Sequence, residues 1–420
     1  MSAMDANAWA IRHYQHPIVR VGNLALGLRR RLSARADRLD VDAMHEIASR
    51  RTGLDDFGPP GYLDAMRRLA AAIDDEAGLH PFGNWMARVH LTDTLINRLL
   101  VARYRRDVPA SRDAPITRPL FILGLPRTGS TMLHHLLAAD PAHRWPSHRE
   151  VSMPAPPPAG RRDPRLFSVE RSWASLHRFA PDLMRKHPTA PDAPDECFPL
   201  FANAFCNPMA EYQWHAPSYG DWLFDDGLRP AYAYFADQVR VLQTRRAGER
   251  WLFKSPMHLG YLDALFAAFP DACVVQLHRD PREVMGSACS LACTLRGLGL
   301  RDDDRRVIGR HMLRKLAREL ARCIEARRRL PAGQFIDIDY ALLVRDPIAA
   351  VQAIHAHFGF VLAPGAVEAM RRHHRAHPKD RHGRHDYAAR DFGLDDELLR
   401  DTFADYLAFR PSIAGSLAQP

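Results

Sequence analysis

The stretch PLFILGLPRTGSTMLHHLLAADP, residues 119–141, joins an apolar run to a glycine-bounded turn and then to a segment with helical periodicity. Gly124 and Gly129 are five residues apart, as are the glycines of the G-x-x-x-x-G-K-[ST] loop that binds nucleoside triphosphates. Ser130 stands where that loop has lysine. The stretch therefore predicts a loop for a phosphate-bearing ligand. Two alternatives remain: a nucleoside triphosphatase that has lost its lysine, or a loop for another ligand.

Four short runs rich in β-branched and aromatic residues are each followed by a segment with helical periodicity. The runs are LFILGL (120–125), WLFKS (251–255), ACVVQLHR (272–279) and FIDIDY (335–340). Such alternation predicts a parallel sheet with crossover helices, and so an α/β fold. Ligands of these sheets bind beyond the carboxyl ends of the strands, which is where the glycine loop lies.

Two regions lie outside this alternation. Residues 1–115 have apolar residues three and four apart, which predicts a helical N-terminal extension to a domain spanning residues 116–420. Residues 146–248 form an insert, rich in proline and aromatic residues, between the first and second strand–helix units. Inserts that leave a rigid scaffold often carry function. We expect this one to form an acceptor pocket or lid; the alternative is a surface excursion that packs on itself.

Composition limits the location and the partners. The 420 residues include 58 Lys and Arg against 49 Asp and Glu, a formal charge of +9, which suits an anionic ligand. The six cysteines have no paired metal spacing, so we expect reduced, structural thiols. Because no run of about 18 apolar residues occurs and the N-terminus lacks a signal-peptide core, we expect a soluble cytoplasmic protein. Peripheral contact with a membrane stays open.

The loop GLPRTGST, residues 124–131, resembles the phosphosulfate loop of the sulfotransferases that use 3′-phosphoadenosine 5′-phosphosulfate (PAPS), in which a basic residue lies inside the loop. A second signature of that family is an arginine at a strand end with a serine eight residues later. HRDPREVMGS, residues 278–287, has Arg279 and Ser287 at these positions. In the family they hold the 3′-phosphate, and arginine suits this role because it binds phosphate oxygens bidentately.

The resemblance covers most of residues 119–400, is to the bacterial branch of the superfamily, and implies a P-loop-type sheet with PAPS as the cofactor. The cofactor-binding residues that it implies are Pro126, Arg127, Thr128, Gly129, Ser130, Thr131, Arg279 and Ser287. Near the C-terminus, Arg381, His382, Gly383 and Arg384 stand where cytosolic members have a glycine- and lysine-containing loop. Their HGRH motif departs from the family's G-x-x-G-x-W-K. We expect them to contact phosphate only because they occupy the corresponding place in the sequence.

Sulfuryl transfer needs cations, a base and alignment of two substrates. We expect Lys254, at the end of the second strand, and Arg127 to supply the positive charge, so that the reaction requires no metal. His258 and Glu150 are competing candidates for the base, with Glu196 third, because the family places a histidine or a glutamate at similar positions.

The acceptor is predicted only as a class. The aromatic stretch EYQWHAPSYGDWLF offers a wall of Tyr212, Trp214, His215, Tyr219 and Trp222, with buried core as the alternative interpretation. We expect the sulfuryl group to be received by a hydroxyl, or an amine, of a small-molecule or lipid acceptor. An apolar and aromatic insert favours a lipid, steroid-like or phenolic hydroxyl over a polyanionic glycan.

Two rival functions make different demands. A P-loop kinase or nucleoside triphosphatase needs a lysine at position 130 and acidic Mg²⁺ ligands, for which Asp337 and Asp339 are candidates. A nucleic-acid-binding protein would need aromatic residues among its basic ones, whereas the basic residues 371–390 include Tyr387 as their one aromatic residue. We therefore expect no nucleic-acid partner.

Overall fold

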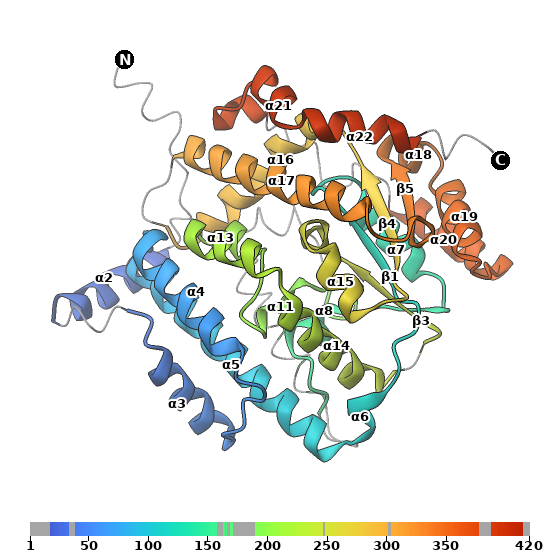
Figure 1. Ribbon diagram of the computed structural model, residues 1–420. Helices are drawn as coiled ribbons and strands as arrows, with labels where there is room; N and C mark the ends of the chain where they lie inside the picture. The colour runs from blue at the N-terminus through green and yellow to red at the C-terminus, as the bar shows by residue number, and fades with distance from the viewer. Residues whose placement is uncertain are drawn as a thin grey trace.

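The computed structural model describes residues 17–32, 38–157, 163, 165, 169–170, 190–246, 248–300, 304–377 and 388–414. Within them the chain forms a five-stranded parallel sheet in the order β2-β3-β1-β4-β5 (Figure 1). The strands are β1 (Leu120–Gly124), β2 (His143–Arg144), β3 (Arg250–Lys254), β4 (Cys273–His278) and β5 (Phe335–Asp339). The α/β class and the four predicted strands are confirmed. The two-residue β2 carries too short a pattern to be predicted.

Alternate residues of the central strand β1 face two different cores. Leu120 and Ile122 belong to one buried cluster, whereas Phe121 and Leu123 belong to a larger cluster on the opposite face. Because side chains alternate along a strand, a continuous apolar run is what a strand buried on both faces requires. β1 therefore lies inside the molecule. After its carboxyl end the chain reaches the surface at Arg127.

Helices cover both faces of the sheet (Figure 1). The smaller cluster is completed by α7 (Ser130–Ala138), α19 (Pro347–Phe358) and α20 (Pro364–Ala376). The larger cluster includes α14 (Arg229–Gln243), η2 (Pro256–Gly260), α15 (Leu262–Ala268), α16 (Pro281–Arg296) and α17 (Arg305–Arg327). Short elements complete the C-terminal part: η3 (Ala332–Gln334), α18 (Tyr340–Arg345), η4 (Ala389–Phe392), α21 (Asp396–Thr402) and α22 (Ala404–Ala414).

The described part of residues 1–115 is helical, as predicted. It comprises α2 (Pro17–Leu32), α3 (Val41–Thr52), α4 (Tyr62–Glu76), α5 (Pro81–Asp107) and α6 (Ala110–Asp113). Leu95 and Leu99 of α5 lie in the same buried cluster as Phe121 of β1. The buried Arg98 donates to the carbonyls of Phe57 and Pro59 and to that of Asn203, at 2.8–3.1 Å. These helices therefore share a core with the sheet, and a domain boundary at residue 115 stays a prediction.

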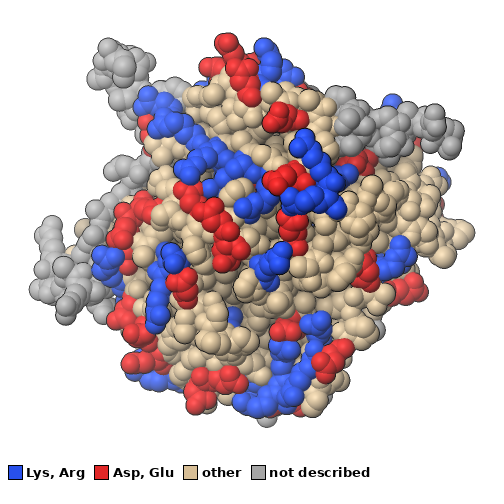
Figure 2. All heavy atoms as spheres, viewed as in Figure 1, with Lys and Arg blue, Asp and Glu red and all other residues tan. Residues whose placement is uncertain are grey.

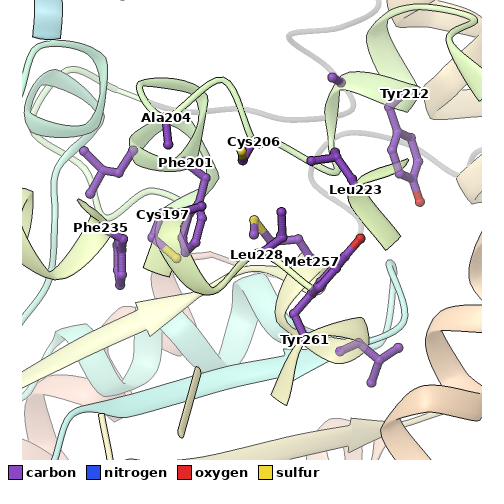
Figure 3. Close-up of a cluster of buried hydrophobic side chains, with 14 of the residues drawn as sticks. Cys197, Phe201, Ala204, Cys206, Tyr212, Leu223, Leu228, Phe235, Met257 and Tyr261 are labelled. Carbon is purple, nitrogen blue, oxygen red and sulfur yellow. The ribbon is translucent and has the colours of Figure 1, made fainter. Parts of the chain in front are cut away.

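The described part of the insert is helical and packs against α4, α15, α16 and η2. Its helices are α8 (His148–Ser152), α11 (Phe198–Ala202), α12 (Ala210–Gln213), α13 (Pro217–Asp226) and α14. Figure 3 shows Cys197, Phe201 and Leu228 of the insert gathered with Met257 of η2 and with Tyr261, which follows it.

The five residues of the expected aromatic wall have different environments. Tyr212, Trp214 and Tyr219 are buried in the core, whereas His215 and Trp222 are partly exposed. For the first three, core is the better interpretation.

A buried ion cluster joins the insert to α17. Lys315 Nζ donates to Glu211 Oε2 and Glu319 Oε1, each at 2.7 Å, and His311 Nε2 lies 3.0 Å from Glu211 Oε1. Burial acts to raise the pKa of Glu211, but Lys315 and His311 lower it to about 2. Because breaking one partner of such a buried pair leaves an uncompensated charge, this cluster holds α12 firmly against α17.

The surface mixes both signs of charge. Figure 2 shows basic side chains gathered over the region of α17, with acidic side chains among them. Among the described residues, we found no helix with the length and apolar character that crossing a membrane requires.

Replacing Gly124 with alanine should destabilise the fold more than the same change at Gly53. Both have positive φ, 145° and 68°, so alanine is strained at either position. At Gly53, in the left-handed region, the strain is about 1–2 kcal/mol. A Cβ at Gly124 would also lie 2.5 Å from the Leu277 carbonyl oxygen, whereas one at Gly53 meets no described atom within 4 Å. Urea unfolding of both variants measures the difference. Equal losses of unfolding free energy would contradict this account of the loop's origin.

Candidate active site

The loop after β1 is held in shape by contacts within the loop. Gly129 has φ 85° and caps the N-terminus of α7, which begins at Ser130. The Thr128 hydroxyl donates to the Leu125 carbonyl at 2.8 Å, and both Thr128 and Pro126 are buried. Thr128 therefore supports the loop from inside. Ser130 and Thr131, in contrast, are partly and fully exposed at the start of α7, where backbone N–H groups and the helix dipole favour an anion.

Two arginines meet at the rim of this loop. Arg127 is exposed and has φ 67°, a conformation that costs a non-glycine residue about 1–2 kcal/mol. Arg279, directly after β4, donates from Nη1 to the Arg127 carbonyl at 2.9 Å. Its guanidinium lies 4.1 Å from the ring centroid of Tyr340 and pairs with Glu283 at 2.9 Å. Strained backbone of this kind is common at ligand-binding turns.

Ser287 lies within α16, the helix that follows Arg279. It is partly exposed, at the second turn of the helix. The two residues of the second signature thus occupy the expected elements, at the end of the strand next to β1.

Lys254 links the loop helix to the insert. It is the last residue of β3 and is buried. Its Nζ donates to Glu196 Oε1 at 2.5 Å and to Thr131 Oγ1 at 3.3 Å. A cation is therefore held between the phosphate-type loop and a carboxylate that comes from a distant part of the sequence.

His258 lies in the core beneath this cation. It is fully buried, its Nδ1 is 2.7 Å from the Tyr232 hydroxyl, and its Nε2 is 3.1 Å from Cys197 Sγ. Burial lowers the pKa of His258 to about 3, so the ring is neutral at pH 7. Both ring nitrogens are engaged by core groups, which favours a structural role over that of a base.

Glu150 is committed to the corner between β2 and α8. Its two carboxylate oxygens accept from Arg144 at 2.6 and 3.1 Å, and Oε2 also accepts from the Ser147 backbone N–H at 2.9 Å. The Ser147 side chain completes a capping box at the start of α8. The buried Arg144 needs this carboxylate as its counter-ion, so the pair is a structural anchor.

Several residues at the site went unnoticed in the sequence. His134 of α7 is buried, and among the described residues its Nε2 has no hydrogen-bond partner. Burial lowers the pKa of His134 well below its usual range, and Lys254 nearby lowers it further. Asp195, next to Glu196, pairs with His148. The available signal was the pair of histidines in the loop helix, which is weak in a chain with 22 histidines.

The carboxylates considered as Mg²⁺ ligands are already paired. Asp337 accepts both arms of the Arg327 fork, at 2.8 and 2.9 Å, and a bond from His278 Nε2 at 2.9 Å. Burial acts to raise the pKa of Asp337, but these hydrogen bonds lower it to about 2. Asp339 caps α18 and pairs with Arg410 at 2.6 Å. Both carboxylates are thus employed in holding β5.

Comparison with known proteins identifies the family. A model of the sulfotransferase family matches residues 119–364, which is more than half of the chain. The protein belongs to the sulfotransferase family. The match begins one residue before β1 and includes the loop, Lys254 and the second signature. The kinase alternative is not favoured.

Solved structures resemble this sulfotransferase over most of its length. Sulfotransferase STF1 from Mycobacterium tuberculosis H37Rv is 34% identical, with a TM-score of 0.78, over 88% of this chain and 99% of that one. Sulfotransferase STF9 from Mycobacterium avium is 28% identical, also with a TM-score of 0.78, over 88% of this chain and 96% of that one.

A third relative carries an acceptor in its name. The omega-hydroxy-beta-dihydromenaquinone-9 sulfotransferase Stf3 from Mycobacterium bovis is 26% identical over 272 residues. The match covers 57% of this chain and 62% of that protein, so it spans less than two thirds of the relative's length.

One group of predicted contacts lies outside the described residues. Arg381, His382, Gly383 and Arg384 fall between the end of α20 and η4, in the range 378–387. Their assignment to phosphate stays a prediction.

Replacing His258 with glutamine should reduce the loss of unfolding free energy as the pH falls below 7. A histidine whose folded pKa is about 3 binds its proton more readily when unfolded, so the stability it contributes is fully present above about pH 6.5 and is lost as pH falls toward 3. The slope that His258 adds is about 1.4 kcal/mol per pH unit at most. Unfolding free energies from pH 7 to 4.5 measure it, with the exposed His357→Gln as control. Equal slopes in wild type and His258→Gln would contradict the buried neutral ring.

Proposed function

We propose that the protein transfers a sulfuryl group from PAPS to a hydroxyl group of a lipid acceptor. The observation that carries this proposal is the gathering of Arg127, Arg279 and Lys254 at the carboxyl ends of three neighbouring strands, around a loop without the triphosphate lysine. These positions suit a ligand with phosphates at two places, one on the loop and one at the end of β4. Family membership supports the transfer chemistry.

The chain's own cations would supply the electrostatic stabilisation. In the proposed step the acceptor oxygen attacks sulfur, the bond from sulfur to the phosphate oxygen breaks, and adenosine 3′,5′-bisphosphate leaves with that electron pair. Lys254 Nζ, 3.3 Å from Thr131 on the loop helix, is close enough to the loop to neutralise charge on the leaving oxygen. Arg127 would balance charge on the sulfuryl oxygens.

Glu196 is our candidate for the base. Of the three residues considered, it contacts the cation at the loop, whereas Glu150 is held by Arg144 and His258 by core groups. When Lys254 turns toward a bound phosphosulfate, its contact with Glu196 Oε1 is released. The carboxylate can then accept the acceptor's proton. One short contact thus holds both groups in place before the substrates arrive.

A lipid acceptor is supported by one comparison. The relative from Mycobacterium bovis is named for a hydroxylated menaquinone. By analogy, the acceptor proposed here has an apolar body and carries a hydroxyl group. The apolar residues that follow Glu196, which are Cys197, Leu200 and Phe201, are fully buried in the core and do not form a wall for that acceptor.

Titration with two nucleotides tests the cofactor. Adenosine 3′,5′-bisphosphate should bind more tightly than ATP with Mg²⁺, because the loop lacks the triphosphate lysine and two carboxylates that could hold Mg²⁺ are paired with arginines. Isothermal titration calorimetry of the full chain measures both. Tighter binding of ATP would overturn the proposal.

Arg127→Gly should lower affinity for adenosine 3′,5′-bisphosphate without weakening the fold. Glycine relieves the strain at φ 67° but loosens the unfolded chain, so unfolding free energy should change by less than about 1 kcal/mol. Loss of a charge-assisted contact should lower affinity by roughly 10- to 150-fold, and Arg279→Ala should do the same. The exposed Arg51→Ala on α3 is the control. Unchanged affinity in both site variants would overturn the assignment.

Glu196→Gln should lower turnover by roughly 10²- to 10⁴-fold while affinity for adenosine 3′,5′-bisphosphate changes little, because it removes a proton acceptor and keeps the side-chain shape. It should also lower thermal stability, because the buried Lys254 loses its counter-ion. Glu150→Gln makes the same chemical change at the Arg144 anchor and should lower thermal stability while the folded enzyme keeps its turnover. Labelled PAPS with a lipid extract, followed by mass spectrometry of sulfated products, measures turnover. Full activity in Glu196→Gln would eliminate Glu196 as the base.

A further inference from the structure

Three buried side chains meet at the opposite end of α7 from the loop. Asp140 follows α7, His143 begins β2, and His355 lies in α19. Their exposed fractions are 3%, 2% and 2%. One potential ligand atom from each lies within 4.8 Å of the others. Residues of these types are seldom buried together without a partner for their polar atoms.

Hydrogen bonds to backbone carbonyls fix the tautomer of both histidine rings. Nδ1 of His143 is 2.9 Å from the Leu137 carbonyl oxygen, and Nδ1 of His355 is 3.0 Å from that of Val351. A carbonyl only accepts, so each Nδ1 carries a hydrogen and each neutral ring has its lone pair on Nε2. This is the arrangement in which metal-binding histidines are usually held, with the other ring N–H donated to a carbonyl.

The inward atoms make no hydrogen bond of good geometry, although His355 Nε2 and Asp140 Oδ2 lie 3.4 Å apart. Among the described residues, neither the two Nε2 atoms nor Asp140 Oδ2 has a hydrogen-bond partner, whereas Asp140 Oδ1 accepts from the Ala142 N–H at 3.0 Å. Leaving three buried polar atoms unsatisfied is destabilising, because each has lost its hydrogen bonds to water and gained none in return. A group bound between them would remove that cost.

We propose that Asp140, His143 and His355 bind a divalent d-block cation, with zinc as the favoured ion. Two imidazoles and one carboxylate form a mixed donor set that suits zinc, whereas Mg²⁺ and Ca²⁺ prefer oxygen ligands. Metal–ligand bonds of about 2.0–2.1 Å in a tetrahedron place ligand atoms about 3.3 Å apart. His355 Nε2 and Asp140 Oδ2 are 3.4 Å apart. Coordination through Nε2 of His143 keeps its bond to Leu137.

A different arrangement could satisfy part of the cluster. A doubly protonated His355 would donate to Asp140 Oδ2 as an ion pair. It would leave His143 Nε2 unsatisfied and would add a cation near Arg250, whose charge already acts on His143. The metal accounts for all three atoms, and the ion pair for two.

The position indicates a structural ion. His143 is paired with Arg250, the first residue of β3, whereas Lys254 is the last. At about 3.3 Å per residue, the length of β3 separates the ion from the active-site cation by about 13 Å. The three ligands come from the end of α7, from β2 and from α19. An ion there would clamp these elements together and would stabilise α7, whose other end carries the loop.

Metal content and cobalt spectra of the full chain test the proposal. Elemental analysis after purification without chelators should find about one zinc per chain, and the chelator-treated protein should show d–d absorption bands when it is titrated with Co²⁺. Added Zn²⁺ should raise its melting temperature, because a ligand of the folded state stabilises it. Absence of bound metal together with absence of a Co²⁺ spectrum would overturn the proposal.

Two histidines on α19 provide a matched pair of variants. His355→Gln should lower zinc affinity by more than about 100-fold, because even loss of a residue that only orients a ligand costs 10- to 100-fold. His357→Gln changes an exposed histidine two residues away and should keep wild-type affinity. If His355→Gln does not fold, Asp140→Asn keeps the shape of the site, and its Co²⁺ spectrum and zinc affinity give the same readout. Equal affinity in wild type, His355→Gln and Asp140→Asn would refute the site.

Discussion

The close approach of β1 to β4 at Gly124 is the constraint on which the site depends. The Leu277 carbonyl lies where a side chain of residue 124 would begin, so the chain can turn into its loop there only as glycine. β1 is buried on both faces, so in this part of the chain polar groups that contact a ligand can come only from the turn that follows the strand. The Arg279 bond to the Arg127 carbonyl then ties the loop to the end of the neighbouring strand. An anion site follows from how two strands pack.

A buried charge organises the other side of the site. Lys254 ends a strand in the interior, where an isolated ammonium group would be far too costly, and Glu196 arrives from the insert to pair with it. The pair links sheet, loop helix and insert, so the insert cannot shift without disturbing the cation. Both groups are buried, so their electric field acts more strongly on a substrate than it would in water.

The sequence predicted what local patterns encode and missed what depends on distant partners. Apolar runs identified four strands, and motif spacing located the loop, Arg279, Ser287 and Lys254 on the expected elements. The partners of His258 are Cys197 and Tyr232, 61 and 26 residues away. The pattern of apolar residues predicts which side chains are buried. It does not predict which polar group a buried polar side chain bonds to.

The shared core has a consequence for how the molecule holds together. Similarity to the family model begins at residue 119, yet Leu95 and Leu99 lie in one apolar cluster with Phe121, and Arg98 binds the backbone of the insert. We therefore expect the segment that the family model matches to depend on the first helices for its stability. Removing the first helices would expose to water the part of the larger apolar cluster that these helices cover.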